Sequence, residues 1–197
     1  MAVIEALQTR WDNGLFEWSI GLADSLIERF ANEQSGGFYF TSHDHEQLIM
    51  RSQAFNDDAM PSGNAIAAQA LYYLGFLTGE TRYLDYAERS LDAASMQLAQ
   101  QPMAYAAMFN ALDIRLHSAT IIVLRGPVEQ MQQWRRRLDR HYLPDVLCFA
   151  IDSTGEAPSQ LQDKKPIHDG VTAYICQGMS CQPPLTQITA LLDHLKI

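Results

Sequence analysis

Ionisable side chains are concentrated in sixteen positions, from His43 to Asp58, directly before an alanine-rich apolar run. Glycoside hydrolysis and related sugar chemistry need ionisable groups that converge in a cleft, usually two carboxylates or a histidine and a carboxylate. Side chains of these types are Asp57, Glu46, Asp44 and His43, which are therefore the candidate catalytic residues. His43 and His45 would share one face of an extended strand. Nothing further selects a metal site over a surface loop, so we predict neither a metal nor a cofactor.

Polar and aromatic residues that suit substrate binding flank these acids. The candidates are Arg51, Asn64, Ser62 and Tyr39. Arginine and asparagine side chains can hydrogen-bond sugar hydroxyls or carboxylates. Tyr39, with Phe38 and Trp18, offers apolar surface for stacking. This set predicts a binding corner built from Arg51, Asp57 and Asn64.

The segment from Asp57 to Asn64 also has a purely structural interpretation. Ser62 or Pro61 can begin a helix, where the first N–H groups have no partner within the helix. An acid at position 57 or 58 is favoured there by the helix dipole. Arg51 and Asp57 would then form an ion pair that pins the loop to the helix, and the histidines would be solvated. Both interpretations remain open from the sequence.

Helical spacing of apolar residues dominates the chain up to about Leu116. The pattern predicts one helix that reaches Phe30 and further helices over about 62–78, from 81, and from 102 to 116. Connections as short as 78–80 join antiparallel neighbours. We therefore predict a region of antiparallel helical hairpins over residues 1–117.

Beyond Leu116 the pattern changes to β-branched runs of strand length. Strands are predicted over 119–124, 146–151 and 171–176, helices over 128–138 and 186–195, and a polar loop over 153–169. This alternation predicts a small α/β unit, residues 118–197, packed on the helical region. The expected fold class is α+β, mainly α.

Two separated motifs carry a family resemblance. The first runs from Gly36-Gly37-Phe38 through Asp57 and Pro61-Ser62-Gly63-Asn64 to Leu77-Thr78-Gly79, and the second comprises 173–176 and 181–186. From about Phe16 to Leu195, the chain resembles the YyaL / spermatogenesis-associated thioredoxin-like family. Asp57 occupies the acid position of the motif.

The resemblance implies more than the residues alone. Members of that family begin with a thioredoxin-like domain and continue into a helical barrel like that of six-hairpin glycosidases and sugar epimerases. This chain resembles only the last part, which implies a partial α/α barrel before the α/β unit. Relatives commonly have glycine at the position of Asp58 and lysine at the position of Gln53.

Composition limits the partners and the location of the protein. The chain has 197 residues, 47% of them hydrophobic, and a formal net charge of −9, which disfavours nucleic acid and anionic membranes. The basic run 135–137 lies among polar residues on a predicted helix and indicates a solvated face. No apolar run can span a bilayer and the first residues do not match a signal peptide, so a cytoplasmic location is expected.

Three cysteines argue against a secreted disulfide framework. Cys148 lies in an apolar run and is expected to be buried. Four residues separate Cys176 from Cys181, which is not the spacing of a redox motif. We interpret them as structural cysteines, with a disulfide or a zinc corner as alternatives.

Three functional classes follow, and the sequence does not decide whether the chain is an enzyme. The first is a carbohydrate-binding or carbohydrate-processing barrel of glycosidase or epimerase type. The second is a non-catalytic interaction module that completes its fold as a homo-oligomer or with a partner chain supplying the missing hairpins. The third is a redox accessory, which the absence of the thioredoxin-like domain disfavours.

Overall fold

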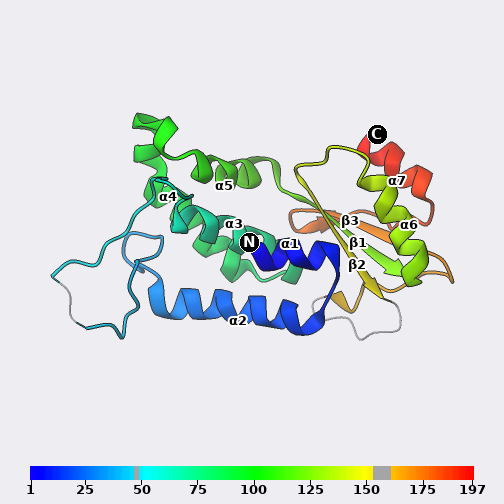
Figure 1. Cartoon of the computed structure of the whole chain (residues 1–197), viewed down its shortest axis with the longest axis horizontal. Coiled ribbons are helices and arrows are strands. Elements are labelled where there is room, and N and C mark those ends of the chain that lie inside the picture. The colour runs from blue at the N-terminus through cyan, green and yellow to red at the C-terminus, as the bar shows by residue number, and fades with distance from the viewer. Residues whose placement is uncertain (47–48, 153–160) are drawn as a thin grey trace. The chain divides into compact units, whose positions relative to one another are not determined.

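The computed structural model of the chain describes residues 1–46, 49–152 and 161–197. In this part of the chain, α-helices and one four-stranded mixed sheet form an α+β fold that is mainly helical, as the sequence predicts (Figure 1). The chain divides into two compact units. Unit 1 comprises Met1, Glu17–Gly75 and Gly79–Ser118, and unit 2 comprises Ala2–Phe16, Phe76–Thr78 and Ala119–Ile197. A helix with the length and hydropathy of a membrane span is absent from the described residues.

Unit 1 is built from helices whose ends the sequence encodes locally. These are most of α2 (Asn13–Phe30) and α3 (Gly63–Thr78), then α4 (Thr81–Gln100), a 3-10 turn (Pro102–Ala104) and α5 (Ala106–His117). The Ser62 hydroxyl caps α3 by accepting the Ala65 N–H at 3.3 Å. Gly79, with φ 76°, closes α3 in the left-handed conformation that glycine adopts without strain. Two residues then connect α3 to α4.

Two sets of hydrogen bonds and ion pairs, here called latches, connect α4 to α2 and to Glu33 just after it, within unit 1. Tyr83 donates its hydroxyl to Asp24 at 2.7 Å, and Arg82 pairs with the same carboxylate. Beyond the end of α2, Glu33 accepts from Tyr86 at 2.6 Å and from Arg89 at 2.8 Å. These hydrogen bonds lower the pKa of Glu33, the Tyr86 hydroxyl contributing most. Repeated acid–tyrosine–arginine contacts therefore set how α2 lies along α4.

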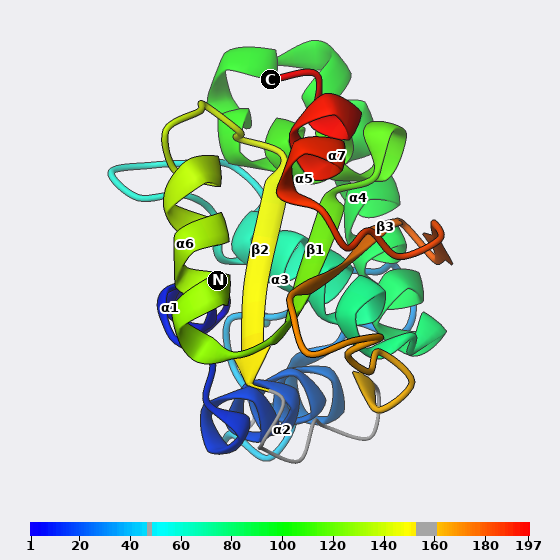
Figure 2. The same ribbon diagram turned by 90° about the vertical axis from the view of Figure 1, so that its right-hand side faces the viewer.

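The sheet of unit 2 has the strand order β2-β1-β3-β4. β1 (Thr120–Gly126) runs parallel to β2 (Val146–Asp152), and α6 (Val128–Leu138) connects them, as Figure 2 shows. β3 (Thr172–Gln177) is antiparallel to β1, and β4 (Ser180–Cys181) is antiparallel to β3. α6 and α7 (Ile188–Leu195) pack their apolar side chains on one face, against Ile122, Leu124 and Ile175 among others. The predicted loop over 153–169 lies partly outside the described residues.

A helix that the sequence analysis does not predict protects the outer edge of this sheet. α1 (Ala2–Thr9) belongs to unit 2 and lies along β2. The Gln8 side chain accepts the Cys148 N–H at 3.1 Å, while Arg135 donates to the carbonyl oxygens of Gln8 and Cys148. These contacts satisfy backbone groups that an exposed edge strand would leave free.

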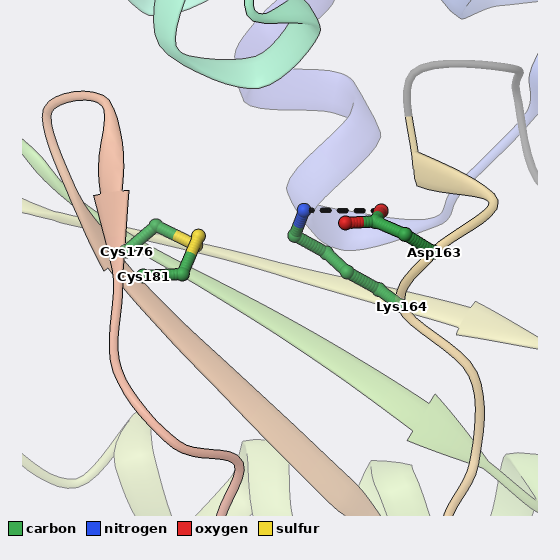
Figure 3. The surroundings of a disulfide bond; sticks show 4 residues. All are labelled: Asp163, Lys164, Cys176 and Cys181. Atoms are coloured by element: carbon green, nitrogen blue, oxygen red, sulfur yellow. Dashed lines mark hydrogen bonds and ion pairs between the residues drawn. A yellow bond between two sulfur atoms is a disulfide. The ribbon is translucent and has the colours of Figure 1, made fainter.

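Cys176 and Cys181 face each other across the β3–β4 ladder and form a disulfide (Figure 3). The disulfide that the sequence leaves as an alternative is therefore the arrangement in the structure. Figure 3 also places Asp163 and Lys164 in the surroundings of this bond, where Lys164 Nζ lies 3.5 Å from the Asp163 carboxylate. Cys148 is buried, as predicted, and burial raises the pKa of its thiol to about 11.

Candidate functional site

A groove of about 430 Å³ opens on unit 1 at the start of α3. Its lining is mainly apolar and aromatic, with a few polar side chains. The described residues that line it are Leu26, Phe38, Tyr39, Phe40, Ser52, Ala54, Asn56, Asp58, Ala59, Met60, Pro61, Ser62, Gly63, Asn64 and Ala67. Of the predicted site residues, Tyr39, Ser62 and Asn64 belong to this lining. Its volume is in the range of a small-ligand site.

Asp57 is held by backbone groups. One carboxylate oxygen accepts the Ser62 N–H at 2.9 Å and the other accepts the Ala107 N–H at 2.8 Å. The Asp57 N–H donates to the Ala104 carbonyl oxygen at 2.8 Å. The carboxylate thus joins the starts of α3 and α5, where the helix dipoles favour negative charge. Its geometry is that of a structural bridge.

Asn64 is buried, and its side chain is also held by backbone groups. Its amide exchanges two hydrogen bonds with the backbone of Phe38, at 2.7 and 3.0 Å, and donates a third to the Ala54 carbonyl oxygen at 2.9 Å. Asn64 thereby ties both extended segments that flank the groove to α3. Together with the capping hydroxyl of Ser62, it shapes the floor of the groove and has little capacity left for a ligand.

The predicted ion pair between Arg51 and Asp57 is not formed. Arg51 Cζ lies 3.9 Å from the centre of the Tyr39 ring, and its Nη1 lies 3.0 Å from His43 Nδ1. Its Nη2 donates to the Thr41 carbonyl oxygen. Because two backbone N–H groups already satisfy Asp57, the guanidinium is instead held by the aromatic segment upstream. Arg51, Asp57 and Asn64 therefore each make their own structural contacts and do not form the expected binding corner.

The other candidate catalytic residues lie on an exposed loop and are absent from the groove lining. These are His43, Asp44 and Glu46. A hydrogen bond from the Ser42 side chain lowers the pKa of Asp44, so this carboxyl is ionised at neutral pH. Within the described ranges, no three His, Cys, Asp or Glu side chains gather closely enough to hold a metal ion.

The groove contains polar groups that the site prediction did not include. Asp58 lines it, and its carboxylate makes no hydrogen bond or ion pair with another described residue. Ser52 and Asn56 add a hydroxyl and an amide, and Phe40 adds an exposed ring. The signal for Phe40 was its place in the run 38–40. The family resemblance marks Asp57 as the acid of the motif, but no sequence signal indicated that the carboxylate of Asp58 would have no partner among the described residues.

A second groove, of about 510 Å³, lies within unit 2 beside the end of β2. Residues of the segment 9–13, of α6 and of Ala150–Asp152 line it. It contains none of the predicted site residues, so it stands apart from the motif at the start of α3.

Chemically, the groove at α3 is suited to binding. Acid–base catalysis on a glycoside needs two carboxyl groups on opposite sides of the bond that is cleaved. Among the described lining residues, Asp58 is the one carboxylate, and Asp57 next to it is committed to the backbone. Aromatic rings beside hydroxyl and amide groups can instead stack on a ligand and orient it.

Comparison with curated proteins finds one group of relatives. The chain is 24% identical over 194 residues to spermatogenesis-associated protein 20 of Homo sapiens, a match that covers 93% of the chain. The proteins of the same name from Rattus norvegicus and Mus musculus are 24% and 23% identical over the same length. No protein-family model matches the chain. It spans about a quarter of the length of these relatives, a match to 24% of each. This similarity agrees with the family resemblance of the two sequence motifs.

Proposed function

We propose that this chain is a non-catalytic binding module whose ligand site is the groove at the start of α3. The observation that supports this proposal is that the polar side chains of the motif are hydrogen-bonded to backbone groups. Asp57, Ser62 and Asn64 direct their side-chain groups to backbone partners. Residues committed in this way shape a groove and do not transfer protons to a substrate.

A carbohydrate is the ligand class that we propose for this groove. The rings of Tyr39 and Phe40 provide apolar faces on which a sugar ring can stack, and Phe40 is 82% exposed. Ser52, Asn56 and Asp58 provide donors and acceptors for sugar hydroxyls. The resemblance to a family whose barrel is related to sugar-processing enzymes points to the same class.

Nuclear magnetic resonance titration of the purified chain with neutral oligosaccharides tests the proposal. We expect shift changes confined to residues of the groove, and weaker binding by about fivefold for Phe40→Ala, since one stacked ring contributes on the order of 1 kcal/mol. Phe109→Ala, which removes an exposed ring of α5 outside the groove lining, is the matched control. Binding with hydrolysis or epimerisation of the sugar would contradict the non-catalytic assignment.

A second candidate function is an interaction module that works as a homo-oligomer. Large apolar side chains of unit 1 remain exposed, including Trp18 at 56% and Leu22 at 47%, one turn apart on α2. Contiguous exposed apolar surface commonly marks a protein interface. A partner chain that supplies further helical hairpins would cover the same residues. Sedimentation equilibrium of the chain alone distinguishes these partners, because only self-association depends on the concentration of this one protein.

A further inference from the structure

Asp58 is the one side chain in the described groove lining that carries a formal charge. Its backbone N–H donates to the Met60 carbonyl oxygen at 3.1 Å. Its carboxylate has no partner among the described residues, in contrast to the fully bonded Asp57. The groove therefore holds one negative charge that no protein group neutralises by direct contact.

Arg51, the basic residue nearest to Asp58 in the sequence, is engaged elsewhere. Arg51 stacks on the Tyr39 ring and hydrogen-bonds His43 and the Thr41 carbonyl oxygen. Its side chain is not part of the groove lining. The whole chain carries a formal charge of −9, so the surrounding field does not offset the carboxylate either.

The aromatic rings of the groove also favour a positively charged ligand. The face of an aromatic ring carries partial negative charge and attracts a cation. Tyr39 already binds the Arg51 guanidinium in this way, at 3.9 Å. Phe40 lines the same groove with an exposed ring that carries no such partner among the contacts of the described residues.

From this combination we infer that the groove selects ligands carrying a protonated amine beside an apolar face. For a carbohydrate, the preferred ligand is a sugar with a free amino group, in preference to a neutral or an acidic sugar of the same size. Asp58 is the residue that determines this preference. The inference rests on the proposed function, because it requires that the groove binds a carbohydrate.

The test compares three oligosaccharides of equal length on the full chain by calorimetry or nuclear magnetic resonance, at mildly acidic pH. The ligands are a glucosamine oligomer with free amines, its N-acetylated counterpart and an acidic galacturonate oligomer. We expect the glucosamine oligomer to bind about tenfold more tightly than the N-acetylated one, the combined effect of an exposed ion pair and a cation–ring contact. The acidic oligomer should bind most weakly, and the preference should shrink as salt is added.

Asp58→Asn should reduce the preference to the smaller part that the cation–ring contact contributes. Asp85→Asn changes the net charge by the same amount at an exposed position of α4 outside the lining, and should keep the full preference. Equal affinities, or a preference that Asp58→Asn does not reduce, would overturn this inference and leave the proposed function standing. Failure of all three oligosaccharides to bind would overturn both.

Discussion

At the scale of single residues, two neighbouring acids of identical type have different roles. Asp57 bridges the first turns of α3 and α5, whereas Asp58 lines the groove with a free carboxylate. The difference arises because only Asp57 directs its carboxylate toward two backbone N–H groups, those of Ser62 and Ala107. A carboxylate with two such donors is a structural element of the fold.

Asp57→Ala should lower the free energy of unfolding by about 2 to 4 kcal/mol, because it leaves the N–H groups of the buried residues Ser62 and Ala107 without an acceptor. Urea denaturation measures the loss, and faster amide hydrogen exchange at both residues would localise it. Asp58→Ala, whose carboxylate has no partner to lose, should stay within about 0.5 kcal/mol. Equal losses for the two variants would show that the bridge does not stabilise the fold.

Arg125 is a second residue whose environment is unusual. It lies on β1 with 5% of its surface exposed, and its Nε and Nη1 are buried without a hydrogen-bond partner among the described residues. Burial lowers its pKa, and the negative charge of Asp152 compensates only in part. A buried cation with so few contacts costs free energy that an apolar side chain of similar length would not.

Arg125→Met should therefore raise the free energy of unfolding, by about 1 to 4 kcal/mol. Thermal and urea denaturation of the full chain measure the change. Arg136→Met, at an exposed position of α6, is the control and should have little effect. A destabilised Arg125→Met would mean that the guanidinium has a favourable interaction worth more than its desolvation.

At the scale of elements, polar latches between helices add orientation to apolar packing. The α2–α4 latches reach from Asp24 and Glu33 to residues almost sixty positions along the chain, with separations of 59 and 56 for the Tyr83 and Arg89 contacts. Packing of apolar side chains alone would allow α2 and α4 to slide along each other. Discrete hydrogen bonds at Asp24 on α2 and at Glu33 just beyond its end fix one alignment.

The Glu33 latch predicts a small pH dependence of stability. Its pKa is lowered in the folded state, so its contribution is fully present above the ordinary carboxyl value of 4.5 and is lost as the pH falls through the lowered value. Glu33→Gln should reduce the loss of unfolding free energy in that acidic range. The reduction should be less than about 1 kcal/mol, because the Glu33 side chain is 60% exposed. Urea denaturation at several acidic pH values measures it. Glu28→Gln, also exposed on α2, should leave the profile as it is in the parent chain.

At the scale of the whole molecule, part of the apolar surface of the helical region stays exposed. Four helices before the α/β unit are too few to cover every large apolar residue that the sequence places there, which are Trp11, Leu15, Trp18, Leu22, Leu71, Leu74, Phe76, Met108 and Phe109. The structure buries Leu71, Leu74 and Met108, with 1%, 3% and 0% exposure. Trp18, Leu22 and Phe109 remain exposed.

We predict that the chain self-associates through the exposed side of α2. The double variant Trp18→Ser with Leu22→Ser should weaken association in sedimentation equilibrium by at least about tenfold, since the two side chains together bury enough apolar area for more than 1.4 kcal/mol. Met179→Ser, which changes an exposed apolar residue of unit 2, should leave association unchanged. A monomer at all concentrations would contradict the prediction and favour a separate partner chain or none.

The sequence by itself determined the elements whose signals are local. Helical spacing, the Ser62 cap and Gly79 set the bounds of α3, and β-branched runs set β1 and β2. These features depend on neighbours within a few positions, so the order of residues suffices to predict them. The α+β class and the motif at the start of α3 follow from the same local signals.

The tertiary structure alone decided what the polar residues of that motif contact. One partner of Asp57 is fifty positions away at Ala107, and one partner of Asn64 is twenty-six positions away at Phe38. The same holds for α1, which the structure places on β2 through Gln8 and Cys148, with a separation of 140 positions. Hydrogen-bond partners at such separations are selected by the packing of whole elements. The motif marks Asp57 as its acid, but the sequence does not record that the Asp57 carboxylate bonds two backbone N–H groups while Asp58 lines the groove.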